Sequence, residues 1–238
     1  MPPLREAFDE RVEEVRTYLD FLDNVEGAFL ESVNSHIWPK ITAPQQRILY
    51  SSVYLQLYNL VEATVTHCLA AVCTATQDRY HPSELSDNLR REWVRQKART
   101  HLPSNPETRL EDALGLARTL IAPEPLSKWK IEVGGGGNWD EQEIDDIARR
   151  LDCTMQVPSH LKRFIANDKR ALSVVKDRRN RLAHGGLSFS ECGASATARD
   201  LRTLADITIS YMSAVVDAFQ SYLACQGFLV PEQRRSNP

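Results

Sequence analysis

The sequence predicts an all-α fold: a four-helix bundle with a smaller helical insertion between the second and third core helices. Four long stretches repeat apolar residues at helical spacing, and no stretch of useful length alternates apolar and polar residues as a half-buried strand does. The chain has 238 residues, of which 42% are hydrophobic and 26% charged, which suits a folded chain rather than a disordered or collagen-like one. We therefore expect a single domain over residues 1–238, with core helices at about 4–76 and 158–225 and the insertion at about 77–157.

The first two core helices are expected at residues 4–32 and 45–76. In the first, the apolar residues recur at intervals of three and four and form one stripe: Phe8, Val12, Val15, Leu19 and Leu22. The second is apolar on more than one side, which is typical of a central bundle helix. Glu62 lies in the middle of this apolar helix, where an unpaired carboxylate would be costly, so we expect it to have a cationic partner.

The predicted insertion has a more broken pattern, with prolines between short helices. Its helices are expected at about 87–100, 107–121 and 138–151. The segment KWKIEV, residues 128–133, is expected to be a short strand or an extended arm. The glycine run 134–137 lacks the spacing of a dinucleotide-binding fingerprint and is expected to be a turn. Asn138 is the expected N-cap of the helix that follows, with Glu141 in the capping-box position.

The last two core helices are expected at residues 158–184 and 198–225. Gly185 follows the third helix in the position of a C-cap glycine. A polar loop then leads to Thr197, the expected N-cap of the fourth helix. The tail from about residue 229 to residue 238 is expected to be disordered.

The cysteines point away from a metal or redox site. There are five, and no two of them form a C-x-x-C pair, so neither a zinc knuckle nor a thioredoxin-like motif is expected. We expect no metal and no cofactor. His67, Cys68 and Cys73 fall within the apolar pattern of the second helix, and we expect them in the core. The N-terminus lacks an apolar signal core, and no apolar run is long enough to span a membrane. The expected location is the cytoplasm, without membrane association.

Charge is distributed unevenly along a chain whose formal net charge is −3. Residues 1–32 carry nine acidic and three basic side chains, whereas residues 160–184 carry eight basic and two acidic ones. A local basic patch concentrates polyanions even on an anionic molecule, so this window is a candidate for nucleic-acid contact. The alternative is a solvated helix face.

The segment DRRNRLAHG, residues 177–185, combines Arg179, Asn180 and His184 at the end of the third core helix. Arginine binds phosphate in bidentate fashion and keeps its proton, whereas histidine titrates near neutrality and can move a proton. Cleavage of RNA without a metal needs both properties. The same residue types also favour a helix end, which is the structural alternative. Because residues five apart differ by about 140° around an ideal helix, Arg179 and His184 converge only if the last turn distorts or a second chain completes the site.

The segment RNRLAH, residues 179–184, resembles the R-N-x-x-x-H signature of the HEPN superfamily, which contains helical bundles, many of them ribonucleases. Four further segments resemble the MAE-like branch of HEPN nucleases, in order and spacing over most of residues 4–225: NLVEATVTHCL, GGNWDEQEIDDIARRLD, RNRLAHGGLSFSECG and TARDLRTLADI. Two features depart from the expected pattern. Arg181 replaces a more usual acidic or polar residue, and the run of four glycines is longer than expected.

The resemblance implies a HEPN-like core, a homodimer with both motifs near its two-fold axis, and a metal-independent RNA endonuclease that leaves a 2′,3′-cyclic phosphate. It makes Arg179 the ligand of the phosphate and transition state, His184 the acid–base residue and Asn180 an orienting residue. Glu62 is expected either to pair with an arginine of the site or to form a structural salt bridge elsewhere. The candidate RNA-binding residues are Arg170, Lys176, Arg178 and Arg181.

Proteins of this kind commonly serve in toxin–antitoxin or anti-phage systems. The implied partners are therefore RNA, a second copy of the chain, and a cognate antitoxin or defence-system protein. Two other readings stay open: a catalytically inactive HEPN-like module that dimerises or binds nucleic acid or protein, and an unrelated enzyme or structural helical protein in which the motif is a helix end.

Overall fold

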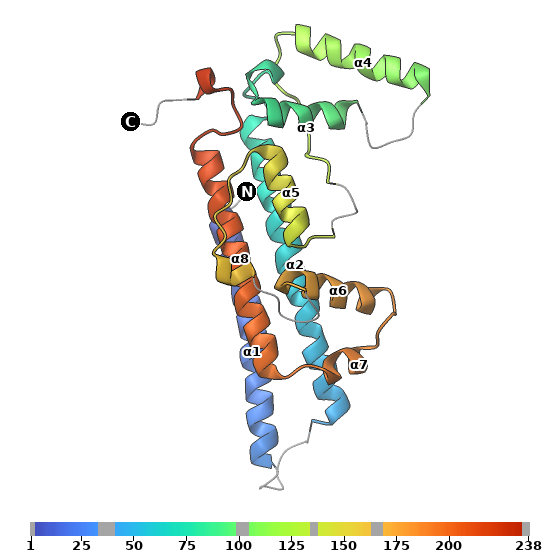
Figure 1. Cartoon of the computed structure of the whole chain (residues 1–238), viewed down its shortest axis with the longest axis vertical. Helices are drawn as coiled ribbons and strands as arrows, with labels where there is room; N and C mark the ends of the chain where they lie inside the picture. Colours follow the sequence, from blue (N-terminus) through green and yellow to red (C-terminus); the bar gives the residue numbers. More distant parts are fainter. Residues whose placement is uncertain (1–2, 33–40, 99–104, 134–137, 163–168, 235–238) are drawn as a thin grey trace. The chain divides into compact units, whose positions relative to one another are not determined.

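The computed structural model describes residues 3–32, 41–98, 105–133, 138–162 and 169–234. These residues form eight α-helices and no β-strand, so the predicted all-α class is confirmed (Figure 1). The helices are α1 (Leu4–Ser32), α2 (Ala43–Thr76), α3 (Asp87–Lys97), α4 (Pro106–Ile121), α5 (Glu141–Leu151), α6 (Ala171–Ala183), α7 (Phe189–Ala194) and α8 (Ala198–Ala224). In the described part of the chain, none of these helices is both long and apolar enough to cross a membrane.

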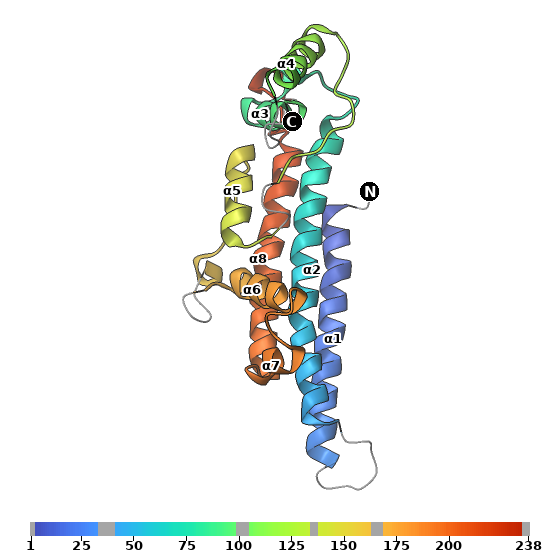
Figure 2. The ribbon, with the colours of Figure 1, turned by 90° about the vertical axis from the view of Figure 1, so that its right-hand side faces the viewer.

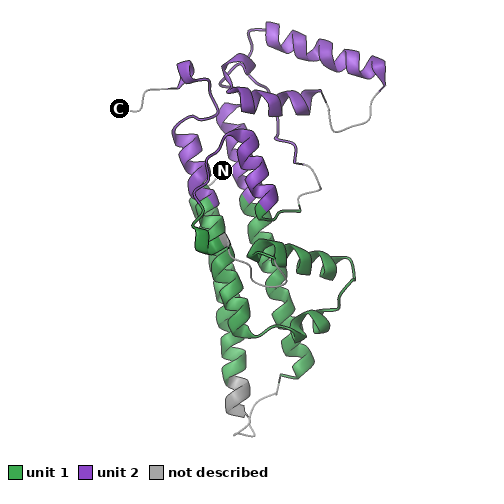
Figure 3. Cartoon of the chain, in the orientation of Figure 1, with its two compact units in different colours: residues 1–64, 138–141, 157–214 green, residues 65–137, 142–156, 215–238 purple. Residues whose placement is uncertain are grey.

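The chain divides into two compact units, which Figure 3 shows in separate colours. Unit 1 comprises Met1–Thr64, Asn138–Glu141 and Val157–Ala214, and unit 2 comprises Val65–Gly137, Gln142–Gln156 and Val215–Pro238. The helices α2 and α8 therefore contribute to both units. Unit 2 does not coincide with the predicted insertion, because residues 138–141 belong to unit 1.

Helix α1 packs against α2 and α8 through the predicted apolar stripe. Its five members are all less than 6% exposed: Phe8, Val12, Val15, Leu19 and Leu22. Burial of each such side chain is worth about 1.5–3 kcal/mol, which makes this stripe the main attachment of α1. Polar contacts add direction: the hydroxyl of Tyr18 donates to the carbonyl of Leu49 in α2 (2.9 Å), and Arg202 of α8 forms ion pairs with Asp20 and Asp23. Figure 2 shows α1 beside α2.

Helix α6 is shorter than the third core helix that the sequence predicts at residues 158–184. Ser159–Lys162 form a 3-10 helix, residues 163–168 lie outside the described part, and Arg170 is extended at φ −79° and ψ 172°. The predicted start at Pro158 is wrong. Proline and serine there are typical of a helix start, but they begin only a short 3-10 helix, and α6 itself begins at Ala171. The first turn of α6 is instead capped by a side chain 31 residues away in sequence.

Helix α7, Phe189–Ala194, lies where the sequence predicts a polar loop. It begins with a capping box: the hydroxyl of Ser188 accepts the N–H of Glu191 (3.2 Å), and the Glu191 carboxylate accepts the N–H of Ser188 (2.9 Å). Gly193 lies directly against α2, since a Cβ atom there would be 1.9 Å from the carbonyl oxygen of Arg47. Only glycine permits this approach, and α7 is thereby held against the first turn of α2.

In unit 2, residues 128–133 form neither a helix nor a strand in the described chain, so the short strand that the sequence allows is not formed. Trp129 and Ile131 are buried, and Nε1 of Trp129 donates to Oγ1 of Thr76 near the end of α2 (3.1 Å). The glycine run 134–137, which is predicted to be a turn, lies outside the described residues.

Glu92 of α3 is the buried charge of unit 2, with 1% of its surface exposed. Its carboxylate pairs with Arg95 at 2.5 Å and also with Arg150 of α5. Arg150 donates in addition to the carbonyl of Glu132 (3.0 Å). The buried carboxylate is therefore paired on two sides and links α3 to α5, and Arg150 links both to Glu132.

The C-terminal tail begins with ordered residues, which corrects the prediction of disorder from residue 229. Leu229 is fully buried and forms an isolated antiparallel bridge with Leu85. The N–H of Val230 donates to the carbonyl of Glu84 (2.9 Å), and Pro231–Gln233 form a 3-10 helix. The apolar residues at the start of the tail complete the core of unit 2, which explains why they are ordered. Residues 235–238 lie outside the described part.

Candidate active site

The N-terminus of α6 is held by the carboxylate of Glu141. One oxygen, Oε1, accepts the N–H of Leu172 (2.8 Å), and the other, Oε2, accepts the N–H and the hydroxyl of Ser173 (3.1 and 2.9 Å). Glu141 is 2% exposed. A carboxylate satisfies the unpaired N–H groups of a first helical turn and is favoured by the helix dipole. Because α5 begins at Glu141, the predicted capping box of Asn138 and Glu141 is wrong: Glu141 caps α6, and Asn138 lies two residues before the N-cap position of α5.

The residues before Glu141 follow α6 along its length. Asp140 forms an ion pair with Lys176, and both side chains are largely shielded from solvent. The Nδ2 group of Asn180 donates to Oδ1 of Asn138 (3.3 Å). We call Asn138–Glu141 the bracing segment, because three of its four side chains contact α6 and the fourth residue, Trp139, contacts α2 through its backbone.

Arg179 projects from α6 onto Tyr58 of α2. The guanidinium carbon lies 3.6 Å from the centroid of the Tyr58 ring. Its Nη1 donates to Oδ1 of Asn180 (2.7 Å), and its Nη2 lies 3.4 Å from Oε2 of Glu62, which forms an ion pair. The structure therefore brings together three of the predicted site residues, Glu62, Arg179 and Asn180, and adds Tyr58.

The ion pair between Glu62 and Arg179 is accessible to solvent. The side chain of Glu62 is 47% exposed and that of Arg179 is 22% exposed. Exposed pairs contribute little net stability, about 0–1 kcal/mol, so an incoming phosphate can replace the carboxylate without a large cost. The guanidinium is the more shielded group of the pair, because one of its faces lies on the ring of Tyr58.

The Tyr58 hydroxyl is a neutral group in this setting. Burial raises its pKa, while the donated N–H of Trp139 (3.1 Å) and the charge of Arg179 act in the opposite direction. The ring therefore presents an uncharged π face to the guanidinium, which is the arrangement that favours a cation.

His184 stands at the C-cap of α6 and is exposed. Its backbone N–H donates to the carbonyl of Asn180 (3.0 Å), and Gly185 follows at φ +70°, which confirms the predicted glycine stop. Among the described residues, no hydrogen bond or ion pair links the His184 side chain to Arg179. An ideal helix separates residues five apart by about 140°, and the hydrogen bond of the His184 N–H continues the helical pattern to this residue.

The candidate RNA-binding residues do not share one face. Lys176 is already paired with Asp140. Arg178 and Arg181 are about 100° and about 160° from Arg179 around an ideal helix. They lie near Cys192, whose thiol pKa is raised by burial and lowered by these two charges. The fourth candidate, Arg170, is half-buried at the N-cap of α6.

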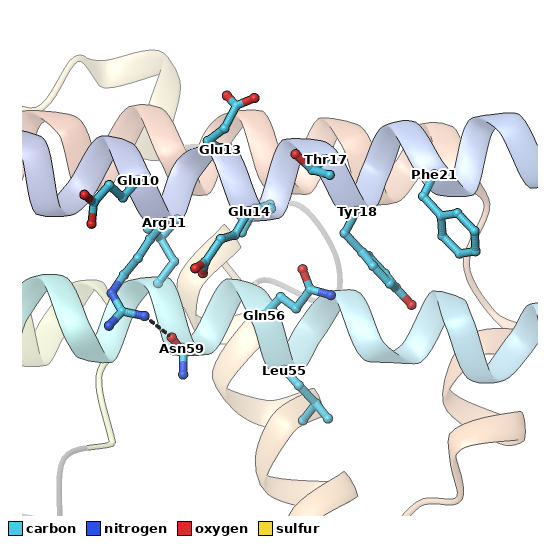
Figure 4. Close-up of a pocket in the computed structure, with 12 residues that line it drawn as sticks. Glu10, Arg11, Glu13, Glu14, Thr17, Tyr18, Phe21, Leu55, Gln56 and Asn59 are labelled. Atoms are coloured by element: carbon cyan, nitrogen blue, oxygen red, sulfur yellow. Dashed lines mark hydrogen bonds between the residues drawn. The ribbon is translucent and has the colours of Figure 1, made fainter.

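A groove of about 870 Å³ lies between α1 and α2 (Figure 4). It is lined by Glu10, Arg11, Glu13, Glu14, Val15, Thr17, Tyr18, Phe21, Leu55, Gln56, Asn59 and Leu60. The one arginine among them donates to Oδ1 of Asn59 (2.8 Å), and the three glutamates leave the rim acidic. An acidic rim repels phosphate, and no residue of the motif lines this groove, so we do not place RNA there.

In the part of the chain that the structure describes, no group of three or more His, Cys, Asp or Glu side chains could hold a metal ion. Cys68 and Cys73, which the sequence places in the core, are buried. Burial raises the pKa of the Cys73 thiol to about 11. His67 is half-buried in the same helix.

Sequence reasoning missed Tyr58 and the role of the bracing segment. Tyr58 lies one turn before Glu62 in α2, so the two share a helix face, and this spacing was the available signal. No sequence pattern indicates that an arginine stacks on a ring, or that a side chain of one helix caps another helix.

Comparison with known proteins gives one family. The family model of MAE_28990-like HEPN proteins matches residues 3–228, a span that includes α6, its motif and the bracing segment. No curated protein and no solved structure matches the chain.

Proposed function

Because the chain belongs to the MAE_28990-like HEPN family, in which RNA cleavage is common, we propose that it is a metal-independent RNA endonuclease. One observation carries the proposal: the arginine of the R-N-x-x-x-H motif is stacked on Tyr58, donates to Asn180 and forms an ion pair with the half-exposed carboxylate of Glu62. This is a cation placed to accept a phosphate by exchange with Glu62.

In the proposed reaction, Arg179 binds the scissile phosphate and stabilises the extra charge of its transition state. The ribose 2′-oxygen forms a bond to phosphorus as the bond to the 5′-oxygen breaks. The 2′-hydroxyl gives up its proton, and the leaving 5′-oxygen takes one, with His184 as the group that moves protons. The products are a 2′,3′-cyclic phosphate and a 5′-hydroxyl. Asn180 orients the guanidinium through its 2.7 Å contact with Nη1.

We propose further that the active form is a homodimer with the two motifs close to its two-fold axis. The separation of Arg179 and His184 on α6 supports this, because a second motif nearby adds the groups that one helix end does not bring together. Each subunit then contributes its own Arg179 and His184, and the two pairs lie close together in one centre at the axis. In its biological role the protein would be a toxin or anti-phage effector, restrained by an antitoxin or another defence-system protein.

The test is cleavage of a single-stranded RNA by the purified protein in EDTA. Arg179→Ala and His184→Ala should each lower the cleavage rate by about 100-fold or more, because each removes a group that acts in the transition state. The control is Arg199→Ala, which removes an exposed arginine of α8 and should leave the rate unchanged. DNA of the same sequence should resist, since it lacks the 2′-hydroxyl.

Several outcomes would contradict the proposal. Full activity of either motif variant would remove the assigned site, and activity that appears only with magnesium would remove the mechanism. Absence of cleavage by the wild type would favour the inactive HEPN-like module. Light scattering of the same preparation tests the dimer, since a monomer that still cuts RNA contradicts it.

A further inference from the structure

We propose that Tyr58 is a positioning residue for Arg179: its ring holds the guanidinium in the plane in which it meets the scissile phosphate. This inference rests on the proposed function and assigns a role to a residue outside the R-N-x-x-x-H motif. The starting observation is the stacked contact, with 3.6 Å between the guanidinium carbon and the ring centroid.

A stacked guanidinium directs its hydrogen bonds sideways, parallel to the ring. The group has five N–H donors in one plane. Asn180 takes one from Nη1 and Glu62 takes one from Nη2, which fixes the rotation of the group within that plane. The remaining N–H groups then point along the ring surface, where a phosphate replacing Glu62 would be met edge-on by a planar fork.

The ring is itself held in place by the bracing segment. The Tyr58 hydroxyl accepts the backbone N–H of Trp139 (3.1 Å), and both side chains are at most 5% exposed. The next two residues fasten the same segment to α6, through the ion pair of Asp140 with Lys176 and the cap by Glu141. The platform beneath Arg179 and the helix that carries Arg179 are thus anchored to one short stretch of chain.

This arrangement predicts different roles for the two parts of the tyrosine. The ring supplies the cation–π contact, and the hydroxyl sets the ring orientation. Tyr58→Phe keeps the contact and loses the hydrogen bond, whereas Tyr58→Leu loses both and is apolar but smaller, a change in size that Tyr50→Leu reproduces. A tyrosine that only filled the core would make both variants differ from the wild type in stability alone.

The experiment measures single-site cleavage of RNA by the wild type, Tyr58→Phe, Tyr58→Leu and the control Tyr50→Leu. Tyr50 is also in α2 and also buried, at 5% exposed, and its hydroxyl contacts Gln46. Tyr58→Leu should lower kcat about tenfold, which corresponds to loss of a shielded cation–π contact, with little change in KM. Tyr58→Phe should retain kcat within about threefold, and Tyr50→Leu should match the wild type once both are folded, as checked by thermal melting.

A second readout does not depend on activity. Protons of the Arg179 side chain that lie over a ring resonate upfield, so NMR of the RNA-free protein should show this shift in the wild type and in Tyr58→Phe. The shift should vanish in Tyr58→Leu. If kcat of Tyr58→Leu equals that of the wild type while Arg179→Ala is inactive, the positioning role is overturned.

The two proposals fail in different ways. If the wild type cuts no RNA, the proposed function fails. The platform is then judged by NMR, and an Arg179 signal that Tyr58→Leu leaves unmoved overturns it.

Discussion

Replacement of Glu141 by alanine tests whether α6 owes its position to a side chain of α5. In the folded protein the carboxylate accepts three hydrogen bonds of 2.8, 3.1 and 2.9 Å from Leu172 and Ser173. In the variant the N–H of Leu172 loses its acceptor in a buried environment, whereas Ser173 is half-buried and can regain water.

The expected loss can be worked out from these contacts. A buried N–H group left without an acceptor costs about 1–3 kcal/mol. Loss of an anion at a helix N-terminus costs about 0.3–1 kcal/mol more, and up to about 2 kcal/mol in partly buried sites. We therefore expect Glu141→Ala to lower the free energy of unfolding by about 3 kcal/mol, and Glu141→Gln, which keeps one acceptor oxygen, by about half as much.

The assay is urea unfolding followed by circular dichroism and tryptophan fluorescence, since Trp139 lies beside the substituted residue. The matched control is Glu10→Ala, which removes an exposed carboxylate of α1 and should change the free energy by less than about 0.5 kcal/mol. A loss below about 1 kcal/mol for Glu141→Ala, or one equal to that of the control, would refute the assignment of this carboxylate as the cap of α6.

Two further predictions concern packing and thiols. Gly193→Ala should destabilise the protein by about 1–3 kcal/mol in the same assay, because its Cβ would overlap a carbonyl of α2, whereas Gly186→Ala, with its nearest atom at 3.7 Å, should have little effect. Burial raises the pKa of Cys73 to about 11 and that of Cys153 to about 12, from 9.0. The folded state therefore favours the protonated thiols. This contribution to the free energy of unfolding is complete below pH 9.0 and is lost as the pH rises through the two raised values. Unfolding midpoints that stay constant from neutral to strongly alkaline pH would contradict this. At neutral pH a thiol reagent should label Cys225, the exposed cysteine, and should label the four buried cysteines only after urea is added.

The long helices could be predicted because their determinants are local. For α1, α2 and α8 the apolar spacing and the end signals place every boundary within two residues of the observed one. Thr197 caps α8 as predicted, with its hydroxyl accepting the N–H of Asp200 (3.1 Å). The start of α6 could not be found in the same way, because its cap comes from Glu141, and no periodic pattern encodes a contact between separate helices. Helix α7 has six residues, too few to show a helical repeat of apolar residues. The signal for it in the sequence is the S-x-x-E capping box.

In the candidate site, too, features set by one helix could be predicted, whereas contacts between separate segments could not. The carboxylate of Glu62 in an apolar helix predicts a cationic partner, and of the alternatives left open by the sequence the structure shows Arg179. The distance around the helix between Arg179 and His184 follows from helix geometry alone. Two contacts depend on how three chain segments are arranged in space: Arg179 stacks on Tyr58, and the N–H of Trp139 donates to the Tyr58 hydroxyl. No pattern in the sequence indicates either contact.

The bracing segment also limits how this protein can be shortened or recombined. Gln142, the residue that follows it, belongs to unit 2, while the segment itself belongs to unit 1. A chain in which residues 77–157 were replaced by a short linker would keep the whole R-N-x-x-x-H motif in its sequence. It would nevertheless lack the cap of α6 and the hydrogen-bond donor to Tyr58. A shortened form of this protein must therefore retain Asn138–Glu141 together with enough flanking residues to connect this segment to the rest of the chain.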